Sequence, residues 1–172
     1  MHIIIDGYNL IRQSRLLIEI ERLDLQHGRE ALVDLLAEYK KAKGYRITVV
    51  FDGAQAETGL PRRDRLRGID LRFSQPGEAA DAVIKQMAAR EKEKALVVTS
   101  DNDIVRYAES KGATTIGAPQ FEERIRMAHF LAQGDGAGSD SKDERRRTTR
   151  KKGPARRLPR SKRRMTRRIA KL

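Results

Sequence analysis

Aspartates follow several short apolar runs of this 172-residue chain. The run 3–5 is followed by Asp6, and the run 95–100 is followed by Asp101, with Asp103 two residues later. Asp81 lies just inside a helical pattern that begins after residue 77. In an open parallel sheet the carboxyl ends of the strands meet at one edge. Carboxylates gathered there repel one another unless they share a cation, so the pattern indicates a divalent-metal site and phosphoryl chemistry.

Each aspartate also has an ordinary structural interpretation. Asp101 or Asp103 can cap the helix that follows it, and Asp6 can be a turn residue at a strand end. Asp52, which follows the apolar run 47–51, is the weakest candidate and is equally explained as a turn residue. The recurrence of carboxylates at one predicted edge favours the joint functional interpretation over the separate structural ones.

Strand and helix patterns alternate along the chain. Strands are expected over 2–6, 46–52, 69–73, 95–99 and 113–116, and helices over 25–43, 79–92, 102–111 and 121–132. Residues 10–23 hold one or two short helical turns, and residues 53–68 are predicted to be a loop. The alternation predicts a three-layer α/β fold, with a doubly wound, mostly parallel sheet and helices on both of its faces. Asp6 and Asp101 would then flank the topological switch point, where ligands bind.

Charge divides the chain into two parts. Residues 1–133 carry 21 Lys and Arg against 20 Asp and Glu, whereas residues 134–172 carry 16 against 4. We therefore predict a folded domain over 1–133 and a flexible, basic, disordered tail over 134–172, with a short helix near 161–171 that forms on a partner. Such a tail binds nucleic-acid phosphate through salt-sensitive contacts, and a role in solubility alone is the alternative.

Several classes of protein are disfavoured. The absence of cysteine excludes disulfides, cysteine-ligated zinc and thiol catalysis. The chain shows no signal-peptide pattern, no apolar run long enough to span a membrane and no glycine-rich nucleotide loop, so a soluble cytoplasmic protein without a membrane partner is expected. The histidines have no metal-ligand or triad spacing. The sequence indicates no oligomeric state.

Four motifs together resemble the NYN-domain ribonucleases, in particular the YacP-like branch of the PIN-like nuclease group. They are Asp6-Gly7-Tyr8-Asn9-Leu10, Phe51-Asp52-Gly53, Glu78-Ala79-Ala80-Asp81 and Ser100-Asp101-Asn102-Asp103. The resemblance covers about residues 1–132, and the basic tail lies outside the recognised pattern.

The resemblance implies a PIN-like α/β/α fold and metal-dependent endonucleolytic cleavage of RNA. Asp6, Asp81 and Asp101 match the acidic triad of the family, and Asp103 matches the second acid of its Ser-Asp-x-Asp motif. Asn9 matches the motif asparagine, which positions the first loop or a bound water. The implied cofactor is Mg²⁺ or Mn²⁺, and the implied partners are mRNA or rRNA and, for the YacP-like branch, the ribosome, which this chain would reach through its basic tail.

Four arginines, at positions 62, 63, 65 and 67, form a separate candidate site. A charged loop is usually only solvated, but this one follows a strand and is expected to project from the carboxyl edge. Arg62, Arg63, Arg65 and Arg67 would there bind the phosphates that flank the scissile bond.

Rival functions remain open at this point. A non-catalytic RNA- or ribosome-binding protein on a nuclease-like fold would keep the affinity of the tail without turnover. A DNA nuclease needs the same carboxylates. A phosphatase of the Asp-x-Asp type is disfavoured because Asp6 is followed by Gly7 and Tyr8.

Overall fold

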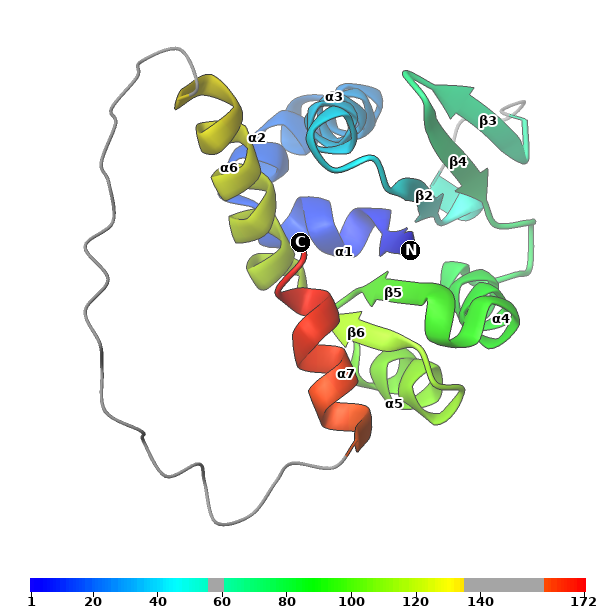
Figure 1. Ribbon diagram of the computed structural model, residues 1–172. Coiled ribbons are helices and arrows are strands. Elements are labelled where there is room, and N and C mark those ends of the chain that lie inside the picture. The colour runs from blue at the N-terminus through cyan, green and yellow to red at the C-terminus, as the bar shows by residue number, and fades with distance from the viewer. Residues whose placement is uncertain (56–60, 135–159) are drawn as a thin grey trace.

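The computed structural model describes residues 1–55, 61–134 and 160–172. In these ranges the chain forms a six-stranded sheet between two layers of helices (Figure 1). The strand order is β3-β4-β2-β1-β5-β6, and all neighbouring strands are parallel except β3 and β4. The strands are β1 (His2–Asp6), β2 (Arg46–Phe51), β3 (Arg63–Leu66), β4 (Ile69–Phe73), β5 (Ala95–Val98) and β6 (Thr114–Ile116). The predicted fold class is thereby confirmed.

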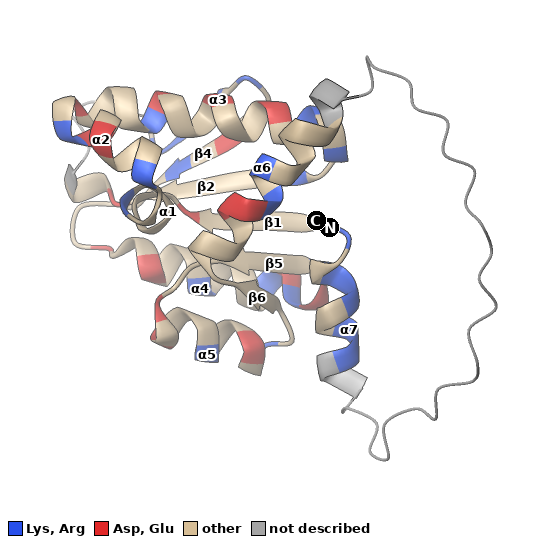
Figure 2. Cartoon of the chain, turned by 90° about the vertical axis from the view of Figure 1, so that its left-hand side faces the viewer, with Lys and Arg blue, Asp and Glu red and all other residues tan. Residues whose placement is uncertain are grey.

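The helices divide between the two faces of the sheet. Four of them, α1, α2, α3 and α6, lie on one face, and α4 and α5 lie on the other (Figures 1 and 2). Short 3₁₀ turns, η1 (Gly53–Gln55) and η2 (Lys92–Lys94), follow β2 and α4. The helices are α1 (Gly7–Gln13), α2 (Arg15–Leu23), α3 (Leu25–Lys43), α4 (Ala80–Glu91), α5 (Asn102–Ser110), α6 (Ala118–Gly134) and α7 (Arg160–Ile169).

The central strands are apolar along their length because helices cover both faces. In β1, Ile3 and Ile5 belong to the core under α1, α3 and α6, whereas Ile4 belongs to the core under α4 and α5. All three side chains are 0% exposed. The core thus fixes β1 from both sides and holds Asp6, its last residue, at the middle of the carboxyl edge.

Three polar caps set the path of the chain after β1. Asp6, Ser14 and Asp24 are the N-cap residues of α1, α2 and α3, and each side chain accepts a hydrogen bond from the amide three residues ahead. Such caps satisfy helix amides that have no partner inside the helix. Residues 10–23, expected to hold one or two short helical turns, therefore belong to two separate helices, of which the first begins at Gly7.

The topological switch point lies between β1 and β5. The chain moves from β1 to β2 on one side, and the strands after α4 continue from β5 to β6 on the other side of β1. The ends of β1 and β5 therefore border the crevice in which open α/β sheets bind ligands. Asp6 and Asp101 flank this crevice, as the sequence predicted.

The prediction of a loop over residues 53–68 is wrong in part. Residues 63–66 form β3, which pairs antiparallel with β4. Arg67 and Gly68 connect these strands with φ values of 50° and 82°, and two consecutive positive φ values define the two-residue hairpin turn that suits the twist of the sheet. All four residues of β3 are exposed, so the strand carries no alternation of apolar and polar residues that sequence reasoning could detect.

The end of the basic segment is a helix that packs on the body. α7 lies along the amino edge of the sheet, opposite the carboxyl edge (Figure 2). Leu172 is 4% exposed and belongs to the main core, and its carbonyl oxygen accepts a 3.1 Å hydrogen bond from the Tyr39 hydroxyl. Arg164 forms two hydrogen bonds with the Glu93 carboxylate, of 2.8 and 2.6 Å. The helix expected near 161–171 therefore has the body of the same chain as its partner, and residues 135–159 of the predicted tail lie outside the described residues.

Among the described residues, no helix is both long and apolar enough to cross a membrane.

Leu172→Ala is expected to destabilise the fold, because it removes a buried side chain from the contact between α7 and the core. The expected loss is about 2 kcal/mol, near the lower end for large-to-small core substitutions. Thermal unfolding followed by circular dichroism measures it. Lys171→Ala, at the exposed neighbouring position, serves as the control and should change stability by less than about 0.5 kcal/mol. Equal melting temperatures for the two variants would contradict the packing of α7 on the body.

Candidate active site

Asp6 is a carboxylate held at the end of the central strand. Its Oδ1 accepts a 3.2 Å hydrogen bond from the amide of Asn9, and its Oδ2 accepts one of 3.2 Å from the Thr99 hydroxyl. Burial raises the pKa of the Asp6 carboxyl above its usual range, and the negative charges of Asp81 and Asp101 raise it further. Desolvation and like-charge repulsion thus outweigh the two hydrogen bonds, which act in the opposite direction.

Asp101 stands across the crevice from Asp6, at the start of α5. Its Oδ1 accepts hydrogen bonds from the amides of Asp103 and Ile104, at 2.7 and 3.3 Å. Its own amide donates a 3.1 Å hydrogen bond to the Thr99 hydroxyl, which in turn donates to Asp6. Capping is therefore a real role of both aspartates, but the capping contacts use Oδ1 in each case, so they are compatible with a second role.

Asp81 and Lys85 are neighbours on one flank of α4. Asp81 lies in the first turn of the helix, and Lys85 follows one turn later. The Lys85 ammonium forms an ion pair with the Asp103 carboxylate of α5. This hydrogen bond is the main reason that the pKa of Lys85 lies above its usual range, and the charges of Asp81 and Asp101 add to it. Asp103, predicted as a fourth acid of the site, is thus engaged by a cation of the chain itself.

Figure 2 shows acidic segments at the end of β1 and near the starts of α4 and α5, all at the carboxyl edge of the sheet. Within the described residues, however, no group of three or more His, Asp or Glu side chains converges closely enough to hold a metal ion. Asp6, Asp81 and Asp101 are near enough to shift a pKa, but they do not share one point at ligand distance. The donor set consists of carboxylate oxygens, which fits Mg²⁺ or Mn²⁺ in chemistry.

Asn9 ties α1 to the end of β5. Its Oδ1 accepts hydrogen bonds from the Ser100 amide and from Gln13 Nε2, each at 3.0 Å. Ser100 Oγ donates a 2.9 Å hydrogen bond to Gln13 Oε1, which closes the network. Asn9 therefore acts in this structure as a bridge between the two loops that carry Asp6 and Asp101.

Sequence reasoning missed three residues of the site, namely Gln13, Lys85 and Thr99. Lys85 carries a readable signal, because it lies four residues after Asp81 and so shares its helix flank. Gln13 lies four residues after Asn9 and is recognisable in the same way. Thr99 has no such signal, since a threonine at a strand end is common and its contact to Asp6 joins segments 93 residues apart.

Asp52 has a structural role in the turn after β2. Its Oδ1 accepts a 2.9 Å hydrogen bond from the Ala54 amide and a 3.4 Å one from the Ser74 hydroxyl. Ser74 Oγ accepts from the amide of Gly53 at 2.9 Å. A Cβ atom at Gly53 would lie 2.0 Å from the Ser74 carbonyl oxygen, so the close approach of the two segments requires glycine. The structural interpretation of Asp52 is the one these contacts support.

The four predicted phosphate-binding arginines do not stay together. Arg63 lies opposite Arg72 at the carboxyl end of β4, and Arg62 precedes it. Arg65 forms a 3.7 Å ion pair with Asp70, and Arg67 forms one with Asp34 of α3. Because β3 runs antiparallel to β4, the chain carries Arg65 and Arg67 away from the carboxyl edge. Their predicted projection from that edge is therefore wrong, and only Arg62 and Arg63 keep the predicted position.

The fold is thus a mostly parallel sheet between two layers of helices, with carboxylates at its switch point. The sequence pattern of the YacP-like NYN domain matches residues 3–170, so the chain belongs to this family. The match reaches into the basic segment that we placed outside the pattern. Residues of α7 are therefore part of the family domain and not an addition to it.

Three comparisons support this membership. The chain is 30% identical over 86 residues to YacP, an uncharacterised protein of Bacillus subtilis strain 168, and the match spans half the length of each protein. The crystal structure of Rae1 (YacP) from Bacillus subtilis superposes with a TM-score of 0.67 at 23% identity, covering 79% of either chain. The crystal structure of a tryptophan-to-leucine mutant of the same Bacillus protein gives a TM-score of 0.64 at 22% identity, covering 77% of this chain and 79% of the other. These structures show the same fold.

Asp6→Asn is expected to stabilise the protein in the absence of divalent metal. The raised pKa means that the folded state disfavours the ionised carboxylate, and this penalty is complete at pH values above the folded pKa. Asparagine caps a helix as well as aspartate does. At neutral pH the melting temperature should rise by roughly 2–4 °C for each kcal/mol of penalty removed.

The sign of the effect can be checked by titration. Below the unfolded pKa, about 3.9, Asp6 is protonated in both states, so the stability difference between Asp6→Asn and the original chain should vanish. The difference should grow as the pH rises through the folded pKa. Thermal melts in EDTA from acid to neutral pH measure it, and a difference that shrinks with rising pH would contradict the assigned repulsion.

Proposed function

We propose that the protein is a divalent-metal-dependent endoribonuclease. The observation that carries the proposal is the placement of Asp6 and Asp101 at the switch point of the sheet, where the Thr99 hydroxyl bonds both residues. Burial, together with the charges of Asp81 and Asp101, raises the pKa of Asp6 there. A fold does not need this arrangement, because capping of α1 requires one acceptor and not three acids at one crevice. A hard cation at the crevice would remove the repulsion, and phosphodiester cleavage is the chemistry that such cations support.

Asp6, Asp81 and Asp101 are the residues that would hold Mg²⁺ or Mn²⁺, with Asp103 beside them. When bound, such a cation polarises a phosphoryl group and lowers the pKa of an attacking water. Thr99 fixes Asp6 and Asp101 relative to each other through its hydroxyl. Lys85 places a positive charge next to Asp81 and Asp103, where it can also attract the negative charge of a phosphodiester.

Replacing Asp6 or Asp101 by asparagine should lower RNA cleavage by at least about 100-fold, because loss of an outer partner of a metal site alone costs about 10–100-fold. Cleavage of a labelled single-stranded RNA in Mn²⁺ measures the effect. Asp52→Asn is the matched control, since Asp52 also follows a strand but serves the turn after β2, and it should cleave at close to the original rate.

Binding of the metal provides a second readout. Mn²⁺ should raise the melting temperature of the original chain and of Asp52→Asn but not of Asp6→Asn. The rival function, a non-catalytic RNA-binding protein, is supported by the lack of a converged ligand group among the described residues. RNA binding without cleavage in Mn²⁺, and without a metal-dependent rise in melting temperature, would establish that rival.

We propose RNA as the substrate and the ribosome as a partner reached through the basic segment. Both proposals are supported by membership of the YacP-like family and by the charge of residues 134–172. Truncation at residue 133 is an unsuitable test, because it would also remove Leu172 from the core. Replacing Arg145, Arg146 and Arg147 by glutamine in the full chain should instead weaken sedimentation with ribosomes, while cleavage of a short free RNA stays unchanged.

A further inference from the structure

The face of β3 and β4 that lies beside α4 is charged and is not part of either core. α4 packs over β1, β2 and β5, and Ile4, Val50 and Val97 lie beneath it. On β4, Ile69 and Leu71 are buried on the opposite face, so Asp70 and Arg72 lie on the face toward α4. Their partners across the hairpin are Arg65 and Arg63, respectively. A groove therefore runs between this hairpin and α4.

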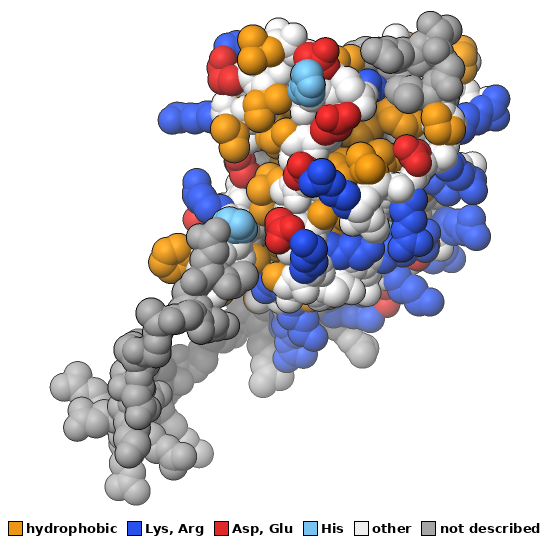
Figure 3. Space-filling model, turned by 90° about the horizontal axis from the view of Figure 1, so that it is seen from above, with side chains coloured by type: hydrophobic (Ala, Val, Ile, Leu, Met, Phe, Trp, Pro, Cys, Tyr) orange, Lys and Arg blue, Asp and Glu red, His pale blue; other side chains and the backbone are white. Residues whose placement is uncertain are grey.

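Two hollows of about 430 and 460 Å³ form this groove. Arg63, Arg72 and Gln86 line both of them, so the two hollows adjoin each other. The part toward the amino edge adds Arg46 and Arg90, and the part toward the carboxyl edge adds Arg62. Figure 3 shows basic side chains along the border of the molecule on the side of the hairpin.

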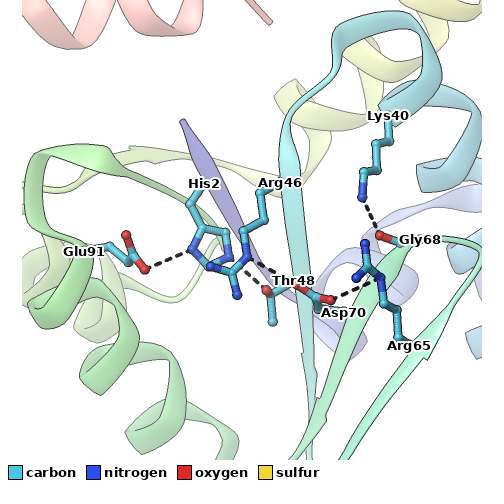
Figure 4. A network of polar contacts seen from close by, with 8 residues as sticks. All are labelled: His2, Lys40, Arg46, Thr48, Arg65, Gly68, Asp70 and Glu91. Carbon is cyan, nitrogen blue, oxygen red and sulfur yellow. Dashed lines mark hydrogen bonds and ion pairs between the residues drawn. The ribbon is translucent and has the colours of Figure 1, made fainter.

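Five arginines line the two hollows against two acidic residues, Glu78 and Glu91, and Asp70 lies beside them on β4. Asp70 forms ion pairs with Arg46 at 3.3 Å and with Arg65 at 3.7 Å (Figure 4). Glu91 lies 3.4 Å from Nδ1 of His2, whose Nε2 is 2.8 Å from the Thr48 hydroxyl. For Arg63, Arg72 and Arg90, by contrast, the described part of the chain offers no ion pair. The surplus charge of the groove is therefore positive.

Arg63 and Arg72 are crowded as like charges. They lie directly opposite each other in the antiparallel pair, an arrangement that destabilises a sheet. Burial lowers the pKa of the Arg72 guanidinium, and the positive charges of Arg63, Arg46 and Arg90 lower it further. A fold selected only for stability would not place these side chains together, whereas a bound polyanion would offset the repulsion.

α4 connects the groove to the acidic site. Asp81 and Lys85 occupy the flank of α4 that faces α5, where Lys85 pairs with Asp103. Val83, Gln86 and Arg90 follow at three- and four-residue spacing on the other flank and line the groove. The two sites thus share the N-terminal end of α4, and a chain that crosses this end can contact both.

We propose that this groove binds the phosphate backbone of the RNA strand as it leaves the acidic site, with Arg62, Arg63, Arg72, Arg90 and Arg46 as its contacts. Guanidinium groups bind phosphate oxygens in pairs of hydrogen bonds without reading the sequence. Phe73 is the one phenylalanine, tyrosine or tryptophan among the residues lining the two hollows, so backbone contacts rather than base stacking determine the affinity. The proposal rests on the proposed function and names the path of its substrate.

The test is the full-length double variant Arg63→Gln with Arg90→Gln, assayed by fluorescence anisotropy with a labelled single-stranded RNA in EDTA. Loss of two phosphate contacts should weaken binding at least roughly tenfold at low salt, since a hydrogen bond to a charged group is lost at each position. The slope of log affinity against log salt concentration should fall by about 1.4, or about 0.7 for each contact.

A matched control removes the same charge elsewhere. Arg22→Gln with Lys41→Gln breaks two exposed ion pairs on α2 and α3, and it should leave affinity and salt slope unchanged. Arg63→Gln alone should unfold at a temperature equal to or above that of the original chain, because it relieves the repulsion with Arg72. Weaker RNA binding by a fold that is no less stable is the signature of a binding role.

Substrate length separates this proposal from the proposed nuclease activity. The double variant should cleave a dinucleotide, whose one phosphodiester is the scissile one, at the original rate, while its kcat/KM for long RNA falls at least roughly tenfold. Unchanged RNA affinity and salt slope would overturn the groove proposal, even if Asp6→Asn abolishes cleavage. Unchanged RNA affinity together with lost sedimentation with ribosomes would also overturn it, and would assign the groove to a protein partner.

Discussion

The electrostatic cost of a carboxylate at the centre of the sheet is the constraint around which this structure is organised. Asp6 ends a strand that is buried on both faces, so it cannot move away from the switch point without moving β1. The Asp6 carboxylate accepts hydrogen bonds there from the Asn9 amide and from the Thr99 hydroxyl. These contacts lower the pKa of Asp6 but do not cancel the effect of burial and of Asp81 and Asp101. Within the described residues, Lys85 places a positive charge near Asp81 and Asp101.

The parts of the fold that sequence could predict are those in which a local pattern and the burial agree. The runs that became β1, β2 and β5 are apolar because helices cover both of their faces, and together with the alternation of strands and helices they indicate a parallel sheet and its switch point. Asp6 and Asp101 were predictable both as helix caps and as site residues. In the structure, each of these side chains caps its helix through Oδ1 alone. Their nearness to Asp81 required the crossover through α4, which the alternation of elements implied.

The parts that sequence could not predict depend on distant contacts or on exposed backbone. β3 has no apolar face, so only its pairing with β4 makes it a strand. α7 carries six basic residues of ten, a composition that indicates disorder, yet two tyrosines donate hydrogen bonds to the carbonyl groups that follow it and Leu172 reaches the core. Thr99 belongs to the site through a contact across the sheet. For α7 and Thr99 the stabilising partner lies far away in the chain, where neither periodicity nor spacing points to it.

Net charge hides how the charges of the body are arranged. Residues 1–133 are almost neutral in sum, but their charges are sorted in space, with carboxylates gathered on one flank of α4 and arginines on the other. Each group by itself is unfavourable, because like charges lie close together within it. The two groups do not neutralise each other, since the helix stands between them. On the proposed function, a cation bound by the carboxylates and a polyanion bound by the arginines would relieve both repulsions at once.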